Sequence, residues 1–193
     1  MLHHPVKTTS ASTKLTYDDY AAIPEDGRRH EIIDGEHYVT PAPFSKHQDI
    51  SRNLLVALAN YLAENRSGTV YHAPYDVVFS NSDVVQPDIL CFTNEHRRIR
   101  TEKNIRGAPD LVIEIISESS RRTDEITKRN LYERFGVAEY WVVDPVVETV
   151  KVYRLTGGRY ERAAELSNEA GGHLETPLLP GFVMDVAAVF REE

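Results

Sequence analysis

The chain has 193 residues, enough for one compact domain with a sizeable hydrophobic core. Its composition, 41% hydrophobic and 27% charged, is ordinary for a globular protein, and no apolar run is long enough to predict a membrane span. The single cysteine, Cys91, excludes an intramolecular disulfide and a cysteine-rich zinc site, and favours a buried thiol in the reducing cytoplasm. The net charge of −8 disfavours a large nucleic-acid footprint but leaves room for a local basic strip.

The N-terminal residues 1–14 are polar and lack the apolar core of a signal peptide. They predict a flexible tail in front of a single domain over residues 15–193. The first element expected in that domain is a short helix over residues 16–23, which a proline ends.

A β-hairpin follows in the run HEIIDGEHYVT, because Asp-Gly between two β-prone runs is the strongest short-range hairpin signal. In a two-residue hairpin Ile33 faces Glu36, and Glu31 faces Tyr38. These four side chains share one face of the ribbon, so the hairpin presents two acids on the same side.

Residues 44–66 carry apolar side chains at three- and four-residue spacing, which predicts a long helix that ends near Gly68. Two strand-like runs come next, over residues 69–80 and 84–92. Residues 93–109 are rich in charge and are expected to form a loop or insertion.

The run DLVIEIIS at residues 110–117 is almost continuously apolar and β-branched, as in a strand covered on both faces. A helix is predicted over residues 123–135, another buried strand over 139–144, and a strand over 148–155 that pairs back on it. The order of elements predicts an α/β (α+β) fold, with a mixed β-sheet flanked by helices.

Glu114 is the most informative residue, because it lies inside the apolar strand LVIEII. By alternation it shares a face with Val112 and Ile116. An ionised carboxylate is costly there unless it binds a metal or is paired. A metal ligand and a partner of a buried arginine are both open interpretations.

Two further acids stand in comparable positions. Asp88 follows Pro87 inside the apolar run VVQPDILCF, where proline removes a ladder hydrogen bond and makes the strand irregular. The alternative for this pair is ordinary turn chemistry at the start of a strand. Glu31 on the hairpin, with Glu36 as an alternative ligand, would complete a set of carboxylates. Mg²⁺ and Mn²⁺ prefer such oxygen ligands.

Lys128 is the fourth candidate. It lies on the helix that follows the Glu114 strand, one turn after Asp124 and one turn before Tyr132. The alternative to a functional role is a surface ion pair with Asp124 at i,i+4 spacing.

Four segments together resemble a known family. They are EIIDGE at residues 31–36, PDIL at 87–90, PDLVIEIIS at 109–117 and KRNLYERFGVAEYWVVDP at 128–145. They resemble the Uma2 family of endonucleases in the PD-(D/E)xK, restriction-endonuclease-like superfamily, and the similarity runs from about residue 15 to residue 155. The resemblance implies a restriction-endonuclease-like fold.

The resemblance also implies a set of metal ligands. Asp88 and Glu114 would hold Mg²⁺ or Mn²⁺, with the backbone carbonyl of Ile115 as a further ligand. Glu31 would bind a second metal ion or orient water. The pair Pro109-Asp110 is interpreted as the start of the strand and not as the signature acid.

The lysine departs from the superfamily pattern. It usually stands two residues after the third acid, where this chain has Ile116. Uma2-like sequences share this departure, and Lys128 resembles the substitute on the following helix. By this resemblance Lys128 would position the attacking water or stabilise charge on the phosphoryl oxygens during in-line hydrolysis of a phosphodiester.

Six basic residues are candidates for contacts with a nucleic-acid backbone, because they lie in the segments 96–106 and 121–134 near the predicted metal-binding strands. They are Arg97, Arg98, Arg100, Lys103, Arg121 and Arg122. A solvated charged loop is the alternative for the first segment. His47 and Gln48, at the start of the long helix, would contact substrate or serve as cap or core residues.

The sequence therefore predicts a Mg²⁺-dependent endonuclease that hydrolyses phosphodiester bonds in DNA, with catalytic residues Glu31, Asp88, Glu114 and Lys128. A homodimer would fit, because cutting a duplex calls for two sites. Two alternatives stay open: an inactive nucleic-acid-binding or regulatory protein on a nuclease fold, and hydrolysis of another phosphate compound. The missing lysine at position 116 and the net charge of −8 favour the inactive protein.

Overall fold

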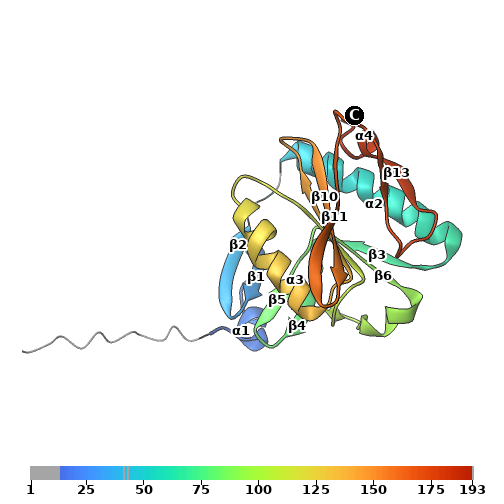
Figure 1. The fold of residues 1–193 in the computed structure, drawn as a ribbon. Helices are drawn as coiled ribbons and strands as arrows, with labels where there is room; N and C mark the ends of the chain where they lie inside the picture. Colours follow the sequence, from blue (N-terminus) through green and yellow to red (C-terminus); the bar gives the residue numbers. More distant parts are fainter. Residues whose placement is uncertain (1–13, 41, 43, 193) are drawn as a thin grey trace, which may run out of the picture.

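The computed structural model describes residues 14–40, 42 and 44–192, so nearly all of the predicted N-terminal tail lies outside the described residues. Its centre is a six-stranded sheet with a different layer on each face (Figure 1). The long helix α2 (Ser45–Asn65) packs on one face, and the helix formed by η2 and α3 packs on the other, together with a second sheet. None of the described helices is long and apolar enough to cross a membrane.

The six-stranded sheet has the order β11-β10-β9-β8-β6-β3. Its strands in chain order are β3 (Gly68–His72), β6 (Ile89–Thr93), β8 (Leu111–Ile115), β9 (Glu139–Asp144), β10 (Thr149–Thr156) and β11 (Arg159–Ser167). All neighbours are antiparallel except β8 and β9. A parallel pair needs a crossover, which is supplied here by η2 (Thr123–Lys128) and α3 (Arg129–Phe135).

The five-stranded sheet has the order β2-β1-β5-β4-β7. Its strands are β1 (Arg29–Ile33), β2 (Glu36–Thr40), β4 (Val77–Ser80), β5 (Asp83–Val85) and β7 (Ile105–Arg106). The predicted hairpin is confirmed, since Ile33 pairs with Glu36 and Glu31 pairs with Tyr38. Both turn residues have positive φ, 53° at Asp34 and 76° at Gly35, as a two-residue hairpin turn requires.

The helices at the N-terminal side also match the sequence. The short helix α1 (Tyr17–Ala21) begins after Thr16, which forms a capping box with Asp19. Helix α2 buries its predicted apolar stripe, namely Ile50, Leu54, Leu58 and Leu62. It ends at Arg66, which adopts the left-handed conformation with a φ of 50°, two residues before the expected glycine.

Two expectations about the middle of the chain were wrong. Residues 69–80 and 84–92 do not form two strands, because each run divides at a proline and contributes one strand to each sheet. A proline has no N–H for a ladder, so the chain can leave one sheet there and join the other. Residues 93–109, expected as a loop or insertion, contain the 3₁₀ helix η1 (Asn94–Ile99) and β7.

Strand β8 separates the two cores. Leu111, Ile113 and Ile115 face α2 together with the C-terminal elements β12 (His173–Glu175), β13 (Val183–Asp185) and α4 (Val186–Val189). Val112 and Ile116 belong to the other core, which contains α3 and the five-stranded sheet. Glu114 alternates with the second set, so its carboxylate enters the space between the two sheets.

Candidate active site

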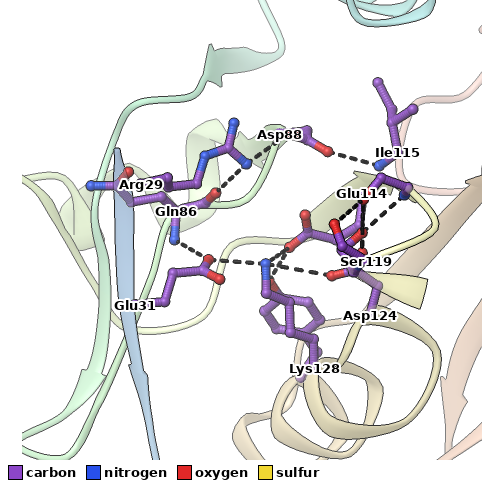
Figure 2. A network of polar contacts seen from close by, with 12 residues as sticks. Arg29, Glu31, Gln86, Asp88, Glu114, Ile115, Ser119, Asp124 and Lys128 are labelled. Carbon is purple, nitrogen blue, oxygen red and sulfur yellow. Dashed lines mark hydrogen bonds and ion pairs between the residues drawn. The ribbon is translucent and has the colours of Figure 1, made fainter. Parts of the chain in front are cut away.

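Lys128 lies at the centre of a cluster of acids (Figure 2). Its Nζ atom is 2.9 Å from Oε1 of Glu31, 3.0 Å from Oε1 of Glu114 and 3.6 Å from Oδ1 of Asp124. The four side chains come from β1, β8 and η2, and each is at most 4% exposed. Three carboxylates thus share one buried ammonium group, so the structure brings Glu31, Glu114 and Lys128 together as the sequence predicted.

The helix that supplies Lys128 has π geometry over residues 123–128. Wide turns of this kind occur often at functional sites. Lys128 follows Asp124 by four residues and pairs with it at 3.6 Å. Tyr132 follows Lys128 by four residues, and its hydroxyl donates a hydrogen bond of 2.6 Å to Oε1 of Glu114. One face of this helix therefore carries an acid, a cation and a hydroxyl group into the space between the sheets.

Glu31 is anchored from the neighbouring strand. The backbone N–H of Gln86, just after β5, donates a hydrogen bond of 2.8 Å to Oε1 of Glu31. The same oxygen contacts Lys128, so the position of the carboxylate is determined by two partners. By contrast, Glu36 is exposed and accepts a hydrogen bond from Tyr38, which excludes it from this cluster.

Asp88 lies in the segment that joins β5 to β6, beside the end of β8. The backbone N–H of Ile115 donates a hydrogen bond of 2.8 Å to Oδ2 of Asp88. The guanidinium of Arg29 is 2.7 Å from Oδ1, and Nε2 of His47 is 3.2 Å from Oδ2. The irregular backbone at Pro87 thus delivers a buried acid to the residue next to Glu114.

The pKa values follow from burial and charge. Burial raises the pKa of Glu114 to about 8 against the opposing charge of Lys128, and burial also raises that of Asp124 to about 6. Burial acts against the charged forms of Asp88 and Lys128 as well. The His47 hydrogen bond and the charge of Arg29 nevertheless lower the pKa of Asp88, and the surrounding carboxylates raise that of Lys128. Lys128 is therefore a cation here, while Glu114 readily holds a proton.

Two cavities open onto this cluster. The larger has a volume of about 500 Å³, and its lining includes Asp88, Glu114, Ile115 and Lys128. The smaller, about 180 Å³, is lined by Glu31 and again by Lys128. The central ammonium group therefore borders both hollows, and a ligand in either could reach the acids.

The donor atoms suit a hard cation, because carboxylate oxygens and a backbone carbonyl are what Mg²⁺ and Mn²⁺ bind. Glu114 uses only Oε1 for the hydrogen bonds to Lys128 and Tyr132. Within the described residues, no three acid, histidine or cysteine side chains converge as a ready metal cage. Arg29 and Lys128 form ion pairs with the carboxylates instead. The oxygen atoms are ligands that suit a metal ion, and an incoming ion would displace these two cations from the carboxylates.

The predicted basic contacts are divided between two places. The segment with Arg97, Arg98, Arg100 and Lys103 follows the far end of β6, in the yellow-green part of Figure 1. β6 separates this segment from the Asp88 end of the strand by roughly 17 Å. The prediction that this segment lies near the acids was wrong. β6 and β8 are antiparallel, and the segment joins them at the end of the sheet away from Asp88 and Glu114.

Arg121 and Arg122 lie closer to the cluster, at the start of the helix that carries Lys128. Arg121 binds Asp144 at 2.7 Å, and Arg122 is exposed. The Pro109-Asp110 pair is at the start of β8, as interpreted from the sequence. Asp110 accepts hydrogen bonds from the backbone and hydroxyl of Thr93, far from Glu114 along the strand.

Sequence reasoning missed several members of the cluster. Arg29 stands two residues before Glu31 on one strand, so alternation could have placed both on the same face. Asp124 and Tyr132 stand four residues on either side of Lys128, a spacing that was noted only as a surface pair. The contribution of the Gln86 backbone had no signal in the sequence, because it depends on the pairing of β1 with β5.

Comparisons with known proteins bear on the fold and the family. A crystal structure described as a "putative nuclease belonging to DUF820 from Anabaena variabilis ATCC 29413" superposes with a TM-score of 0.76. It is 22% identical and covers 91% of this chain and 97% of its own, a likeness that shows the fold. No match was found among curated proteins. The family model described as "Uma2: Putative restriction endonuclease" matches residues 17–187. The chain therefore belongs to the Uma2 family.

Proposed function

We propose that this protein is a metal-dependent endonuclease that hydrolyses phosphodiester bonds in DNA. The observation that carries the proposal is the meeting of Asp88, Glu114 and Lys128 at one cavity, from three separate elements. Buried carboxylates are costly unless they are paired or bind a metal ion, and a cluster of such groups with shifted pKa values at a cavity is a candidate functional site. The Uma2 family and the structural relative are both described as nucleases, which supports the same reaction class.

Asp88 and Glu114 would hold Mg²⁺ or Mn²⁺, with the carbonyl of Ile115 as a third ligand. Glu31 would take a second ion or orient water. A bound ion lowers the pKa of water and offsets the charge of a phosphate. The hydrogen bond from the N–H of Ile115 to Asp88 positions this acid beside Glu114 before any ligand arrives.

Lys128 supplies positive charge. Its raised pKa keeps the ammonium protonated, so it acts by stabilising negative charge on the phosphoryl oxygens and not as a general base. Arg29 is the second cation at the cavity, with a side chain that is 20% exposed. It can transfer one of its hydrogen bonds from Asp88 to a phosphate when a metal ion takes over that acid.

The test is cleavage of labelled DNA by the wild type, Asp88→Asn and Glu114→Gln in Mg²⁺, Mn²⁺ and EDTA. We expect cleavage that requires metal and disappears in both variants. Glu175→Gln, an exposed acid on β12, is the matched control and should cleave like the wild type. The melting temperature is measured in the same buffers. The proposal is wrong if no metal ion raises the melting temperature of the wild type and no DNA is cut.

A second function rests on one specific observation, the complete pairing of Asp88 and Lys128 with groups of the chain itself. Such a saturated network also suits an inactive protein that binds nucleic acid. That protein would bind DNA in EDTA as tightly as in Mg²⁺ and would cut none. The homodimer stays a prediction, which light scattering of the 21.9 kDa chain would test.

A further inference from the structure

Two exposed apolar side chains stand at the larger cavity. Phe44 is 85% exposed and Val146 is 80% exposed, and both line the cavity that contains Asp88 and Glu114. They are the two most exposed of the large hydrophobic side chains among the residues that the structure describes. Single exposed apolar residues need no explanation, but two that share the entrance of a cavity with buried acids form a surface suited to an apolar group.

The segments that carry the two side chains are connected to the acids. Phe44 is the N-cap of α2, and Val146 lies in the turn between β9 and β10. An ion pair of 2.6 Å between Lys46 and Glu148 connects these two elements. The residue after Lys46, His47, contacts Asp88. The start of α2 is therefore linked both to the turn and to the acid cluster. The segments that carry Phe44 and Val146 are thus linked to each other and to Asp88.

The charges around the cavity do not suit a broad duplex footprint. The three Lys and Arg side chains in its lining are Arg29, Lys46 and Lys128, and each is paired with a carboxylate. Duplex DNA is held mainly by many cationic contacts to phosphates, and the chain as a whole carries a net charge of −8. Binding at this cavity must draw on other forces.

An unpaired base can supply such a force by stacking on an aromatic side chain. In a duplex the faces of the bases are stacked and hidden, whereas an unpaired base offers its π-face to an aromatic side chain. Tyr38 and the exposed Val39 line the smaller cavity, which shares Lys128 with the larger one. A strand that crosses both cavities would meet Phe44 in the larger and Tyr38 in the smaller.

We propose that Phe44 and Val146 hold an unpaired base next to the scissile phosphate, so that the substrate is single-stranded DNA. This inference rests on the proposed nuclease function. Phe44 supplies the stacking surface, Val146 packs against the edge or other face of the base, and the carboxylates act on the adjacent phosphate. The smaller cavity takes the neighbouring base against Tyr38.

The first experiment measures kcat/KM on a single-stranded oligonucleotide and on its duplex in Mg²⁺. We expect faster cleavage of the single strand and a loss of about tenfold or more in Phe44→Ala, as stacking energies per base imply. Phe44→Trp should retain activity. Val183→Ala, which removes a side chain 56% exposed on β13 and away from both cavities, should match the wild type. Preference for the duplex, or full activity of Phe44→Ala on the single strand, overturns the proposal.

A second readout does not depend on cleavage. A single-stranded oligonucleotide that contains 2-aminopurine is titrated with wild type, Phe44→Ala and Val183→Ala in Ca²⁺. We expect quenching of the fluorescence by the wild type and Val183→Ala, because a stacked fluorophore is quenched, and little quenching by Phe44→Ala. Quenching without cleavage in Mg²⁺ would keep this subsite and reject the nuclease function. Equal quenching by all three proteins rejects the subsite.

The other possible occupant of the entrance is a second copy of this chain. Light scattering at several protein concentrations decides between them. We expect the same mass for the wild type and Phe44→Ala. A wild-type dimer that becomes a monomer in Phe44→Ala would assign this surface to an interface between copies and overturn the stacking proposal.

Discussion

Lys128 and Glu114 meet at 3.0 Å, although they come from a helix and from the strand that precedes it. The position two residues after Glu114, where the superfamily has its lysine, holds Ile116, and this side chain is 2% exposed in the core between the sheets. By alternation, a lysine at position 116 would lie on the same face as Glu114. In this chain the long side chain of Lys128 reaches the Glu114 carboxylate from the helix that packs on that face. Lys128 thus supplies an ammonium group to Glu114 from the following helix, while position 116 contributes an apolar side chain to the core.

The first prediction concerns stability. Lys128→Met should lower the free energy of unfolding by about 3–5 kcal/mol in EDTA, because it leaves buried carboxylates without their cation. Mg²⁺ should restore part of the loss. Lys151→Met is the matched control, since Lys151 pairs with Glu125 near the surface, and this change should cost less than about 1 kcal/mol. Urea denaturation of both variants gives the comparison, and equal losses would contradict the prediction.

The second prediction concerns pH. Because the pKa values of Glu114 and Asp124 are raised to about 8 and about 6, the folded protein keeps protons that the unfolded chain has already lost. The contribution of these two acids to stability without metal is therefore full only below their unfolded pKa values of 4.5 and 3.8, and a few kcal/mol of it is lost as the pH rises to 8. Asp88 has a lowered pKa and acts in the opposite direction only below pH 4.

Urea midpoints measured between pH 5 and pH 8.5 in EDTA test this dependence. Glu114→Gln should flatten the decline above pH 6, because the amide has no proton to lose. Mg²⁺ should flatten it in the wild type, since a bound cation takes the place of the protons. A wild-type stability that stays constant over this range would show that both acids are already ionised in the folded protein.

The third prediction concerns the hydroxyl of Tyr132. Tyr132→Phe removes the 2.6 Å hydrogen bond to Glu114, so the charged form of the acid loses a donor and its pKa rises. The acid limb of the cleavage-rate profile should move to higher pH, and stability should fall by about 1–3 kcal/mol. Tyr140→Phe removes a buried hydrogen bond to the backbone oxygen of Asp124 and serves as control. Its profile should keep the wild-type position, whereas identical shifts in both variants would contradict the assignment.

The fourth prediction concerns the basic segment. The double variant Arg97→Gln/Arg98→Gln should cleave a short oligonucleotide within about twofold of the wild type, because charges beyond about 8 Å are largely screened at physiological salt. Arg29→Gln should lower kcat/KM by about tenfold or more, since Arg29 lines the cavity and contacts Asp88. Rates on one oligonucleotide at two salt concentrations decide this. A large loss in the double variant alone would place the substrate at the far end of the sheet.

The features that the sequence determined by itself depend on interactions between residues close together in the chain. The Asp34-Gly35 turn requires positive φ at both positions, which is a property of two residues and their neighbours, and it set the register that places Glu31 opposite Tyr38. The apolar stripe of α2 and the alternation in β8 are also local. For this reason Glu114, and Asp88 beside Pro87, could be recognised as acids within apolar runs, whereas Glu31 was singled out only together with the family resemblance.

Only the tertiary structure decided how these parts meet. Which strands pair, and in which direction, is settled by contacts between distant segments, so the sequence did not show that residues 93–109 return at the end of β6 away from Asp88. The same holds for Arg29 and His47, which reach Asp88 across 59 and 41 residues. Charge at the site depends on these distances, because a buried carboxylate keeps or loses its proton according to the cations that folding brings within a few ångströms.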